Sequence, residues 1–530
     1  MSIDARPASE HPVPAHLAAL DDPHAWLEDV EGKDALAWVG ERNAHAAEAI
    51  ESRPGFAATR ESIREVLDSP DKIPHVVRRG EWLYNFWTDA EHPRGLWRRT
   101  SLESYRTTDP EWQVLIDVDA LNAAEGEDWV WHGANVLRPE YRRTLVALSH
   151  GGSDADVTRE LDLDTLTWVD PADGGFFRPE AKGSLGWIDE DTVFVATDTG
   201  PGSLTDSGYP RTVRRWRRGT PLESAELVYE GVATDLAVSA SHDHTPGFER
   251  DFVARALEFY AAEEYVLRPD GELVRIDVPT SAEIGVHREW LTIELREDWA
   301  PVPDGETYPA GSLLATVLED FLAGDRRVTP LFTPTPTTSL AGGTWTRHHL
   351  VITVLDDVKH RPVVLTPPVP AVVGAPWARG ELPGVSPMGT IAVGAVDRVD
   401  SDEVWLIQTD FLTPSTLSLV DVAAGTEPEP LKSAPAFFDA EGLEITQHFA
   451  TSADGTRVPY FQVGPTAGSG DSAGSDDPAR DADTATSSGP APTLLYGYGG
   501  FEISLTPSYP GGLGRAWLER GGTYVLANIR

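Results

Sequence analysis

The sequence contains no cysteine in its 530 residues, which excludes disulfide bonds, thiolate metal sites and a cysteine nucleophile. It also has no apolar run of about 18 residues, the length from which a membrane-spanning helix is expected. The polar stretch from Met1 to Pro12 lacks the apolar segment of a secretion signal. We therefore expect a cytoplasmic protein that does not insert into a membrane.

Lysine and arginine are scarce: there are 43 of them against 85 aspartates and glutamates, and the formal charge is −42. Such a charge repels phosphate backbones and anionic lipid surfaces, so neither nucleic acid nor a membrane is expected as a partner. Hydrophobic residues make up 40% of the chain and include 17 tryptophans, enough for large cores. The chain is longer than most chains that fold around a single hydrophobic core, so at least two domains are expected.

The sequence predicts a flexible N-terminal segment followed by helices. Residues 1–20 are polar and contain proline, and we expect them to be a flexible N-terminus. Residues 21–71 predict a helical segment, whose first helix would be capped by Asp34 and would stop before Pro54. A second helix is predicted from Ala57 to Leu67. The first helix would present one apolar face, made of Leu36, Val39, Ala46 and Ile50.

The apolar pattern changes from helical to alternating at about residue 72, which indicates short strands separated by turns rich in glycine, proline and aspartate. Few helical stretches interrupt residues 72–435, so a β-propeller or a large sandwich is favoured over βαβ units. No repeat of fixed period is present, and the pattern alone leaves the number of blades open. The clearest strands are Trp82–Phe86, Leu145–Leu148, Val193–Val195, Trp290–Ile293, Leu350–Val354 and Val404–Ile407.

The remaining chain, from residue 436, begins with a predicted hairpin around Asp454-Gly455. Residues 466–492 are a low-complexity run of small and polar residues, for which we expect a disordered insertion. A short buried strand is predicted from Thr493 to Tyr496, followed by a tight glycine-rich turn. Chemistry in α/β sheets is usually placed on loops at the carboxyl ends of strands, so the aromatic residues of this turn are candidates. Simple aromatic packing is the alternative.

Three stretches near the end resemble the start of the peptidase domain of the prolyl oligopeptidase family of serine peptidases. They are Tyr496-Gly-Tyr-Gly-Gly-Phe501, Ser504-Leu-Thr-Pro507 and Gly521-Gly-Thr-Tyr-Val-Leu-Ala-Asn-Ile-Arg530. Two upstream stretches agree, Asp22-Pro-His-Ala-Trp-Leu-Glu-Asp29 and Asp454-Gly-Thr-Arg-Val-Pro459. The resemblance implies a seven-bladed β-propeller over residues 72–435 and the beginning of an α/β-hydrolase domain over residues 436–530. It also implies that the helical segment of residues 21–71 packs on the hydrolase domain.

The resemblance assigns roles to two aromatic residues. Tyr498 matches the tyrosine whose hydroxyl stabilises the negative charge that forms on the substrate carbonyl oxygen, an interaction commonly worth about 3 kcal/mol. Phe501 matches the residue lining the S1 pocket, which holds the residue before the scissile bond and where a flat apolar wall suits proline. The implied function is hydrolysis of short peptides after proline, with the propeller limiting access to oligopeptide substrates. No cofactor is implied, and the complete enzyme would be a monomer.

In that family the serine, aspartate and histidine of the catalytic triad all follow the strand that ends in Asn528-Ile-Arg530. We therefore expect the 530-residue chain to be truncated, to lack the triad and to be inactive alone. Gly470-Asp-Ser-Ala-Gly474 matches the pattern of a nucleophile elbow, but its flanks are polar where an elbow needs a strand and a helix. We interpret Ser472 as a match by composition, and an esterase that uses it as the alternative.

Two other functions stay open. The chain could be a non-catalytic propeller that binds peptides or proteins, or an oligopeptidase preferring basic residues, which the acidic composition would suit. Two close histidine pairs, His242 with His244 and His348 with His349, lack further carboxylates at fitting positions to complete a ligand set. No metal is therefore expected.

Overall fold

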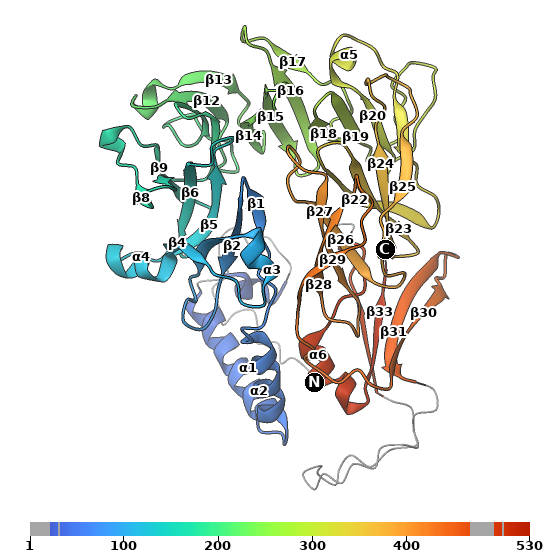
Figure 1. The fold of residues 1–530 in the computed structure, drawn as a ribbon. Coiled ribbons are helices and arrows are strands. Elements are labelled where there is room, and N and C mark those ends of the chain that lie inside the picture. Colours follow the sequence, from blue (N-terminus) through green and yellow to red (C-terminus); the bar gives the residue numbers. More distant parts are fainter. Residues whose placement is uncertain (1–21, 30–31, 467–491, 501–502, 530) are drawn as a thin grey trace. The chain divides into compact units, whose positions relative to one another are not determined.

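The computed structural model describes residues 22–29, 32–466, 492–500 and 503–529. Figure 1 shows the helices and strands of the chain, which divides into two compact units. The first combines the residues up to Ser69 with Phe437–Asp439 and Gly511–Arg520. The second combines Pro70–Ala436, Ala440–Pro510 and Gly521–Arg530. Predictions for the flexible N-terminus and for the insertion fall largely outside the described residues, and the predicted domain boundaries stay predictions.

The first unit contains the predicted N-terminal helices. A short 3-10 turn (Ala25–Glu28) precedes α1 (Lys33–Glu51), and α2 spans Phe56–Leu67. The prediction that Asp34 caps α1 is wrong, because α1 begins at Lys33, the residue at its N-cap position is Gly32, and no side chain caps it. The predicted apolar face of α1 is also not packed: Leu36 is 56% exposed and Ile50 is 50% exposed.

Helix α2 packs against a helix from the far end of the sequence, α6 (Gly511–Ala516), which a 3-10 turn (Leu518–Arg520) follows. Glycines allow this approach: a Cβ on Gly512 would lie 3.6 Å from Ile63, and a Cβ on Gly514 would lie only 2.0 Å from the ring of Phe438. Arg515 then fixes the arrangement by donating from Nε to the carbonyl oxygen of Phe437 at 2.6 Å. Helical residues of the first 70 positions therefore share one unit with residues beyond 500.

Strands β1–β29 of the second unit form seven successive sheets, numbered here 1 to 7 in chain order. Within each sheet the strands follow one another in sequence as antiparallel neighbours, and β9 additionally pairs with β7. Such meanders are the usual construction of a propeller blade. The predicted strands listed above are confirmed, since they fall within β2, β6, β11, β19, β23 and β27.

Sheet 1 contains β1 (Val77–Arg79), β2 (Trp82–Trp87), β3 (Leu96–Ser101) and β4 (Gln113–Asp117); sheet 2 contains β5 (Trp129–Val136), β6 (Arg143–His150), β7 (Asp156–Asp162), β8 (Thr167–Trp168) and β9 (Phe177–Ala181). Sheet 3 contains β10 (Ser184–Asp189), β11 (Thr192–Ala196), β12 (Thr212–Arg217) and β13 (Glu226–Glu230); sheet 4 contains β14 (Ala237–Asp243), β15 (Arg250–Glu258), β16 (Ala261–Leu267) and β17 (Leu273–Arg275). Sheet 5 contains β18 (Glu283–His287), β19 (Trp290–Glu294), β20 (Leu313–Val317) and β21 (Thr329–Phe332); sheet 6 contains β22 (Thr338–Trp345), β23 (Leu350–Asp356), β24 (Lys359–Thr366) and β25 (Ala378–Glu381). Sheet 7 contains β26 (Thr390–Ala395), β27 (Glu403–Thr409), β28 (Thr416–Asp421) and β29 (Glu429–Ser433), and the short helices α3 (Leu102–Arg106), α4 (Val118–Glu125) and α5 (Leu318–Leu322) follow strands of sheets 1 and 5.

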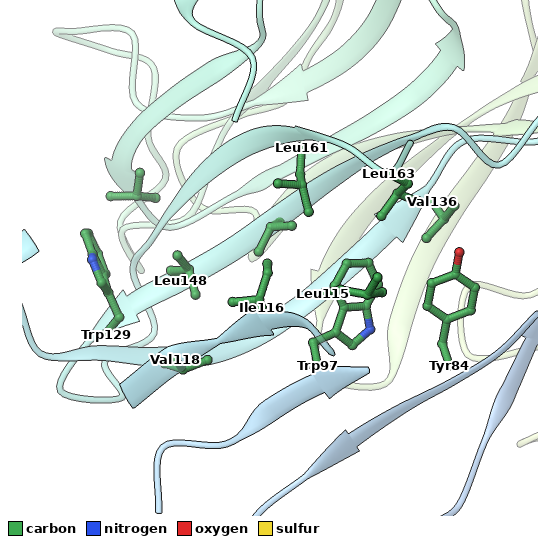
Figure 2. Packing of buried hydrophobic residues seen from close by; sticks show 12 residues of the cluster. Tyr84, Trp97, Leu115, Ile116, Val118, Trp129, Val136, Leu148, Leu161 and Leu163 are labelled. Carbon is green, nitrogen blue, oxygen red and sulfur yellow. The ribbon is translucent and has the colours of Figure 1, made fainter. Parts of the chain in front are cut away.

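A hydrophobic core lies between each sheet and the next. Figure 2 shows the core between sheets 1 and 2, which includes Tyr84, Trp97, Trp129 and Leu148. Corresponding cores join sheets 2 and 3, 3 and 4, 4 and 5, 5 and 6, and 6 and 7. Each large apolar side chain that is fully buried in these cores stabilises the fold by about 1.5–3 kcal/mol relative to an exposed one.

A further core joins the last sheet to the first. It brings Leu83 and Tyr105 of sheet 1 and its following helix together with Trp405 and Leu419 of sheet 7. At the surface the guanidinium of Arg106 donates to both carboxylate oxygens of Glu429, at 2.8 and 3.0 Å. The seven sheets therefore close on themselves through side chains, and each sheet is made of one continuous stretch of sequence.

Two polar groups are buried deeply among these sheets. The carboxylate of Glu160 accepts from Arg218 at 2.9 and 3.1 Å and from the backbone N–H of Phe176 at 2.9 Å. The ring of His287 is 2% exposed and stacks on Trp345, with 4.6 Å between the ring centroids. Burial lowers the pKa of His287 to about 4, because a charged imidazolium would lose its hydration there.

Sheet 8 is the last sheet and has the strand order β30 (Leu443–Thr451), β31 (Arg457–Pro465), β33 (Thr523–Ala527), β32 (Thr493–Gly497). The predicted hairpin around Asp454-Gly455 is confirmed, with Gly455 at φ 88°. Strands β32 and β33 are parallel. The strand predicted at residues 493–496 exists, but its predicted burial is wrong: β32 is the edge of the described sheet and Leu495 is 67% exposed.

Sheet 8 contacts the tip of sheet 7 in the same unit. Phe411, in the loop between β27 and β28, lies with its ring centroid 5.7 Å from that of Phe461 and 6.1 Å from that of Tyr524. Phe411 and Phe461 are buried. Among the described residues, no helix combines the length and the apolar character needed to cross a bilayer.

Candidate active site

The candidate site lies where the parallel strands β32 and β33 end. Their register pairs Thr493 with Thr523 and Gly497 with Ala527, so the residues that follow, Tyr498 and Asn528, leave the sheet at the same edge. A Cβ on Gly497 would lie 3.2 Å from Ile529, which is tighter than most real contacts. The carboxyl edge of parallel strands is where α/β folds usually place their chemistry.

Tyr498 is held on the turn by the glycines around it. Its phenol ring lies over Gly500, where an added Cβ would come within 2.7 Å of the hydroxyl oxygen. The side chain of Tyr498 is 38% exposed, and among the described residues its hydroxyl has no hydrogen-bond partner. The hydroxyl is therefore available to donate to a ligand. Phe501, the other predicted site residue, lies outside the described residues, as does Ser472.

Asn528 connects the end of β33 to the two neighbouring segments. Its side-chain oxygen accepts from the backbone N–H of Leu505 at 3.0 Å, and its own backbone N–H donates to the carbonyl oxygen of Pro459 at 3.0 Å. The segment after the tyrosine turn and the start of β31 are thus tied to one residue. Because of these bonds, the side of the site formed by sheet 8 has a defined shape.

A cleft of about 690 Å³ opens at this edge, between sheet 6 and sheet 8. The sheet 6 wall is formed by Thr335, Pro336, Thr337, Thr338, Ser339, Leu355, Asp357 and Val358. The sheet 8 wall is formed by Thr456, Arg457, Val458, Pro459, Gly499, Ile503, Ser504, Asn528 and Ile529. The volume is in the range of ligand sites, and both walls contain apolar side chains as well as hydroxyl groups.

The charges in the cleft neutralise each other. Among the described residues that line it, Asp357 is the one carboxylate and Arg457 the one cation, and their atoms Oδ1 and Nη1 lie 2.7 Å apart. The cleft therefore offers a neutral surface of hydroxyl, amide and aliphatic groups, although the chain as a whole carries a formal charge of −42. A neutral peptide fits such a surface without losing charge–water contacts.

The histidine pairs that we singled out are used in structural contacts. Nδ1 of His242 lies 2.7 Å from a carboxylate oxygen of Asp251, and Nδ1 of His348 lies 2.7 Å from one of Asp402. Within the part of the chain that the structure describes, no group of three or more metal-ligating side chains converges. In both contacts the histidine pairs with an aspartate and not with a serine, so these contacts do not form a catalytic triad.

Similarity to known proteins identifies the family of this chain. Residues 6–245 match the family model for the prolyl oligopeptidase N-terminal β-propeller domain. The uncharacterised peptidase y4nA of Sinorhizobium fredii is 36% identical over 519 residues, which cover 96% of this chain and 67% of that protein. The chain belongs to the prolyl oligopeptidase family of serine peptidases. It spans about two thirds of the length of the family members that it matches.

Solved structures of the family agree with the fold. The structure described as a post-proline cleaving enzyme from Rickettsia typhi is 27% identical, with a TM-score of 0.81, and covers 95% of this chain and 71% of that one. Oligopeptidase B from Leishmania major is 16% identical with a TM-score of 0.70, covering 96% of this chain and 67% of that one, and supports the fold alone. A propeller joined to a hydrolase domain, as in these prolyl oligopeptidase relatives, is therefore the architecture of this chain.

Part of the cleft could not be predicted from the sequence. Arg457 and Asn528 lie within the stretches that resemble the family, but the resemblance assigns them no role, and Asp357 and the Thr335–Ser339 segment lie outside those stretches. These residues come from sheets 6 and 8, which are far apart in the sequence. No local pattern marks them, except that Arg457 follows the Asp454-Gly455 turn and so lies at the start of a strand.

Proposed function

We propose that this protein is a serine-type oligopeptidase that hydrolyses short peptides after proline. The family supports the peptidase activity, and the observation that carries the site is the unpartnered hydroxyl of Tyr498 in the turn that follows β32, next to Gly499, which lines the cleft. A hydroxyl held in place before the reaction stabilises the developing oxyanion without having to reorganise. Phe501 would line the adjoining S1 pocket.

The preference for proline over basic residues rests on the charge of the cleft. A pocket for lysine or arginine needs a carboxylate that is free to pair with it, whereas Asp357 is already bonded to Arg457. An uncharged imino acid needs only apolar contact and hydrogen bonds to the neighbouring peptide groups. The described walls supply these through Ile503, Ile529 and the threonines of the Thr335–Ser339 segment.

The propeller is proposed to control which molecules reach the site. We take the seven closed sheets to be seven blades of one propeller, so that folded proteins are kept out and oligopeptides are admitted. The protein would act as a cytoplasmic monomer and need no cofactor. We also propose that residues 1–530 alone are inactive, a proposal supported by their covering only 67–68% of the length of the two peptidases that they match.

The first test uses the protein from its native source. A fluorophosphonate probe that reacts with activated serines, followed by intact mass, reports whether the active species carries more chain than the 57.6 kDa of these residues. We expect a labelled, heavier species and no labelling of purified residues 1–530. Labelling of the 57.6 kDa chain would contradict the proposed inactivity, and its loss in Ser472→Ala would indicate the esterase alternative.

The second test addresses the substrate class. A sample of the same native enzyme that has not been exposed to the probe is given two matched fluorogenic peptides of equal length that differ only in proline or arginine before the scissile bond. We expect kcat/KM to favour the proline peptide by at least tenfold. A preference for arginine would refute the proline assignment and leave the peptidase assignment standing, whereas cleavage of neither peptide would count against both and favour a binding role.

A further inference from the structure

The tip of the β23–β24 hairpin in sheet 6 has an unusual backbone. Its two loop residues, Asp357 and Val358, have φ angles of 47° and 64°, in the left-handed region. Two-residue hairpin turns of this type strongly favour Asn-Gly or Asp-Gly, and a β-branched residue at positive φ is strained. Both residues line the cleft. Strained backbone conformations cluster at functional sites, where the surrounding structure maintains them.

Asp357 makes hydrogen bonds to three different segments of the chain. Its backbone N–H donates to the carbonyl oxygen of Thr337 at 2.9 Å, on the sheet 6 wall of the cleft. Its carbonyl oxygen accepts from the side-chain amide of Gln447, on β30, at 2.7 Å. Its carboxylate accepts from Arg457, at the start of β31, at 2.7 Å. One residue therefore holds both walls of the cleft.

The partner of Asp357 is fixed on its own side as well. The guanidinium carbon of Arg457 lies 3.4 Å from the centre of the Phe449 ring, on the neighbouring strand β30. A cation above an aromatic face is attracted to it and loses freedom of movement. The pair thus connects the hairpin tip of sheet 6 to the β30–β31 hairpin of sheet 8.

We propose that Asp357 is a positioning residue that sets the distance between the two walls of the cleft, and thereby the affinity for peptides. The identity of the ligand rests on the function proposed above, whereas the effect on the walls does not. A partly exposed ion pair favours the state in which it is formed over the state in which it is broken. The equilibrium constant between the two states changes by a factor of about two to five. When the binding-competent state becomes rarer by such a factor, the apparent dissociation constant rises by up to the same factor.

The distance across the walls can be measured directly, because the chain has no cysteine of its own. Cysteines introduced by Arg361→Cys on β24 and Thr446→Cys on β30 carry spin labels, and double electron–electron resonance gives the distance distribution. Arg457→Glu places two carboxylates opposite each other, so we expect a longer and broader distance at an unchanged unfolding midpoint. Arg457→Lys, which keeps the charge, should restore the original distribution.

The control is Asp164→Asn, which removes an exposed ion pair with Arg142 in sheet 2, away from the cleft. It should leave the distance unchanged. A distribution in Arg457→Glu that equals that of the unsubstituted chain would overturn the positioning role. So would an equal shift in the control, because the effect would then be general.

Binding of a neutral acetylated and amidated hexapeptide with a central proline is measured by calorimetry on the same chains. We expect Asp357→Asn, which tolerates the left-handed backbone, to weaken binding about two- to fivefold, or roughly 0.4–1 kcal/mol at 1.4 kcal/mol per tenfold. Equal affinity would overturn the link from Asp357 to peptide binding. An unsubstituted chain that binds no peptide while Arg457→Glu still widens the distance would count against the proposed function and support the positioning role.

Discussion

Replacing Gly514 by alanine should break the packing of α6 in the first unit. A Cβ at this position would lie 2.0, 2.3 and 2.4 Å from three atoms of the Phe438 ring, distances that real contacts do not reach. Phe438 is 6% exposed, so its ring has no free space to move into without leaving its site. The substitution therefore forces either the helix or the ring away.

The change in stability is the difference between the cost of the steric clash and the gain in helix preference. Forcing extra volume into a packed site costs about 1–3 kcal/mol, and displacing a buried phenylalanine loses up to about 3 kcal/mol of burial. Alanine is favoured over glycine in a helix by about 1 kcal/mol. Since either the helix or the ring moves, we expect a net loss of up to about 2 kcal/mol in the stability of this unit for Gly514→Ala.

A second glycine of the same helix provides the matched control. At Gly512 a Cβ would meet only Ile63, at an ordinary contact distance of 3.6 Å. Gly512→Ala should therefore stabilise the unit by up to about 1 kcal/mol, since the helical preference acts without the clash. In a Phe438→Ala background, Gly514→Ala should likewise become neutral or stabilising.

Hydrogen exchange with mass spectrometry on peptides from α2 and α6 reports local opening of the unit, and urea unfolding reports the global effect. Faster exchange in both helices for Gly514→Ala, with slower exchange for Gly512→Ala, is the expected result. If both substitutions shift exchange in the same direction, steric contact with Phe438 is not what requires glycine at position 514, and the reasoning fails.

Three further predictions concern the site and the cores. In the active enzyme, Tyr498→Phe should lower kcat by about 10²–10³ with little change in KM, whereas Tyr496→Phe should retain activity; equal rates for both would contradict the oxyanion role. The pKa of His287 is about 4 in the folded chain and about 6.5 in the unfolded chain, so its contribution to stability should be fully present above pH 6.5 and fall by about 3 kcal/mol towards pH 4. Urea titrations at several pH values should show that the free energy of unfolding depends less steeply on pH in His287→Gln. Glu160→Gln should lose about 2–3 kcal/mol at pH 7, since Arg218 would then lack its buried counter-charge, and a loss below 0.5 kcal/mol in urea unfolding would refute this.

The strands of the propeller could be predicted from the sequence, because their apolar runs are short and turns separate them. Their closure into a ring was not, because each sheet is buried on both faces. In β2, Leu83 points into the core shared with sheet 7 and Tyr84 into the core shared with sheet 2. Strands buried on both faces lose the simple alternation of apolar and polar residues, so the pattern does not say which sheets are neighbours.

The helices and the last strands show a different limit. The extent of α1 was predicted to within a residue or two, but its apolar face was expected to pack and is exposed, because periodicity identifies a face and not what covers it. The same holds for β32, whose Leu494 and Leu495 suggested burial. For the site, resemblance predicted Tyr498 and Phe501, while Asp357 could not be found because its importance comes from contacts with residues 90 and 100 positions away.

The way in which the seven sheets close has a consequence for how the chain folds. Six of the seven cores join stretches that are adjacent in sequence, and they can form one after another as the chain collapses. The seventh must bring together residues more than 300 positions apart, such as Arg106 and Glu429, which are separated by 323. Since loop-closure entropy grows only with the logarithm of length, this last step costs roughly 1.6 kcal/mol more than closing a loop of about 50 residues. We therefore expect pulse-labelling hydrogen exchange to find protection at Tyr105 and Leu419 last, and the slow, long-range part of folding to be confined to a single seam.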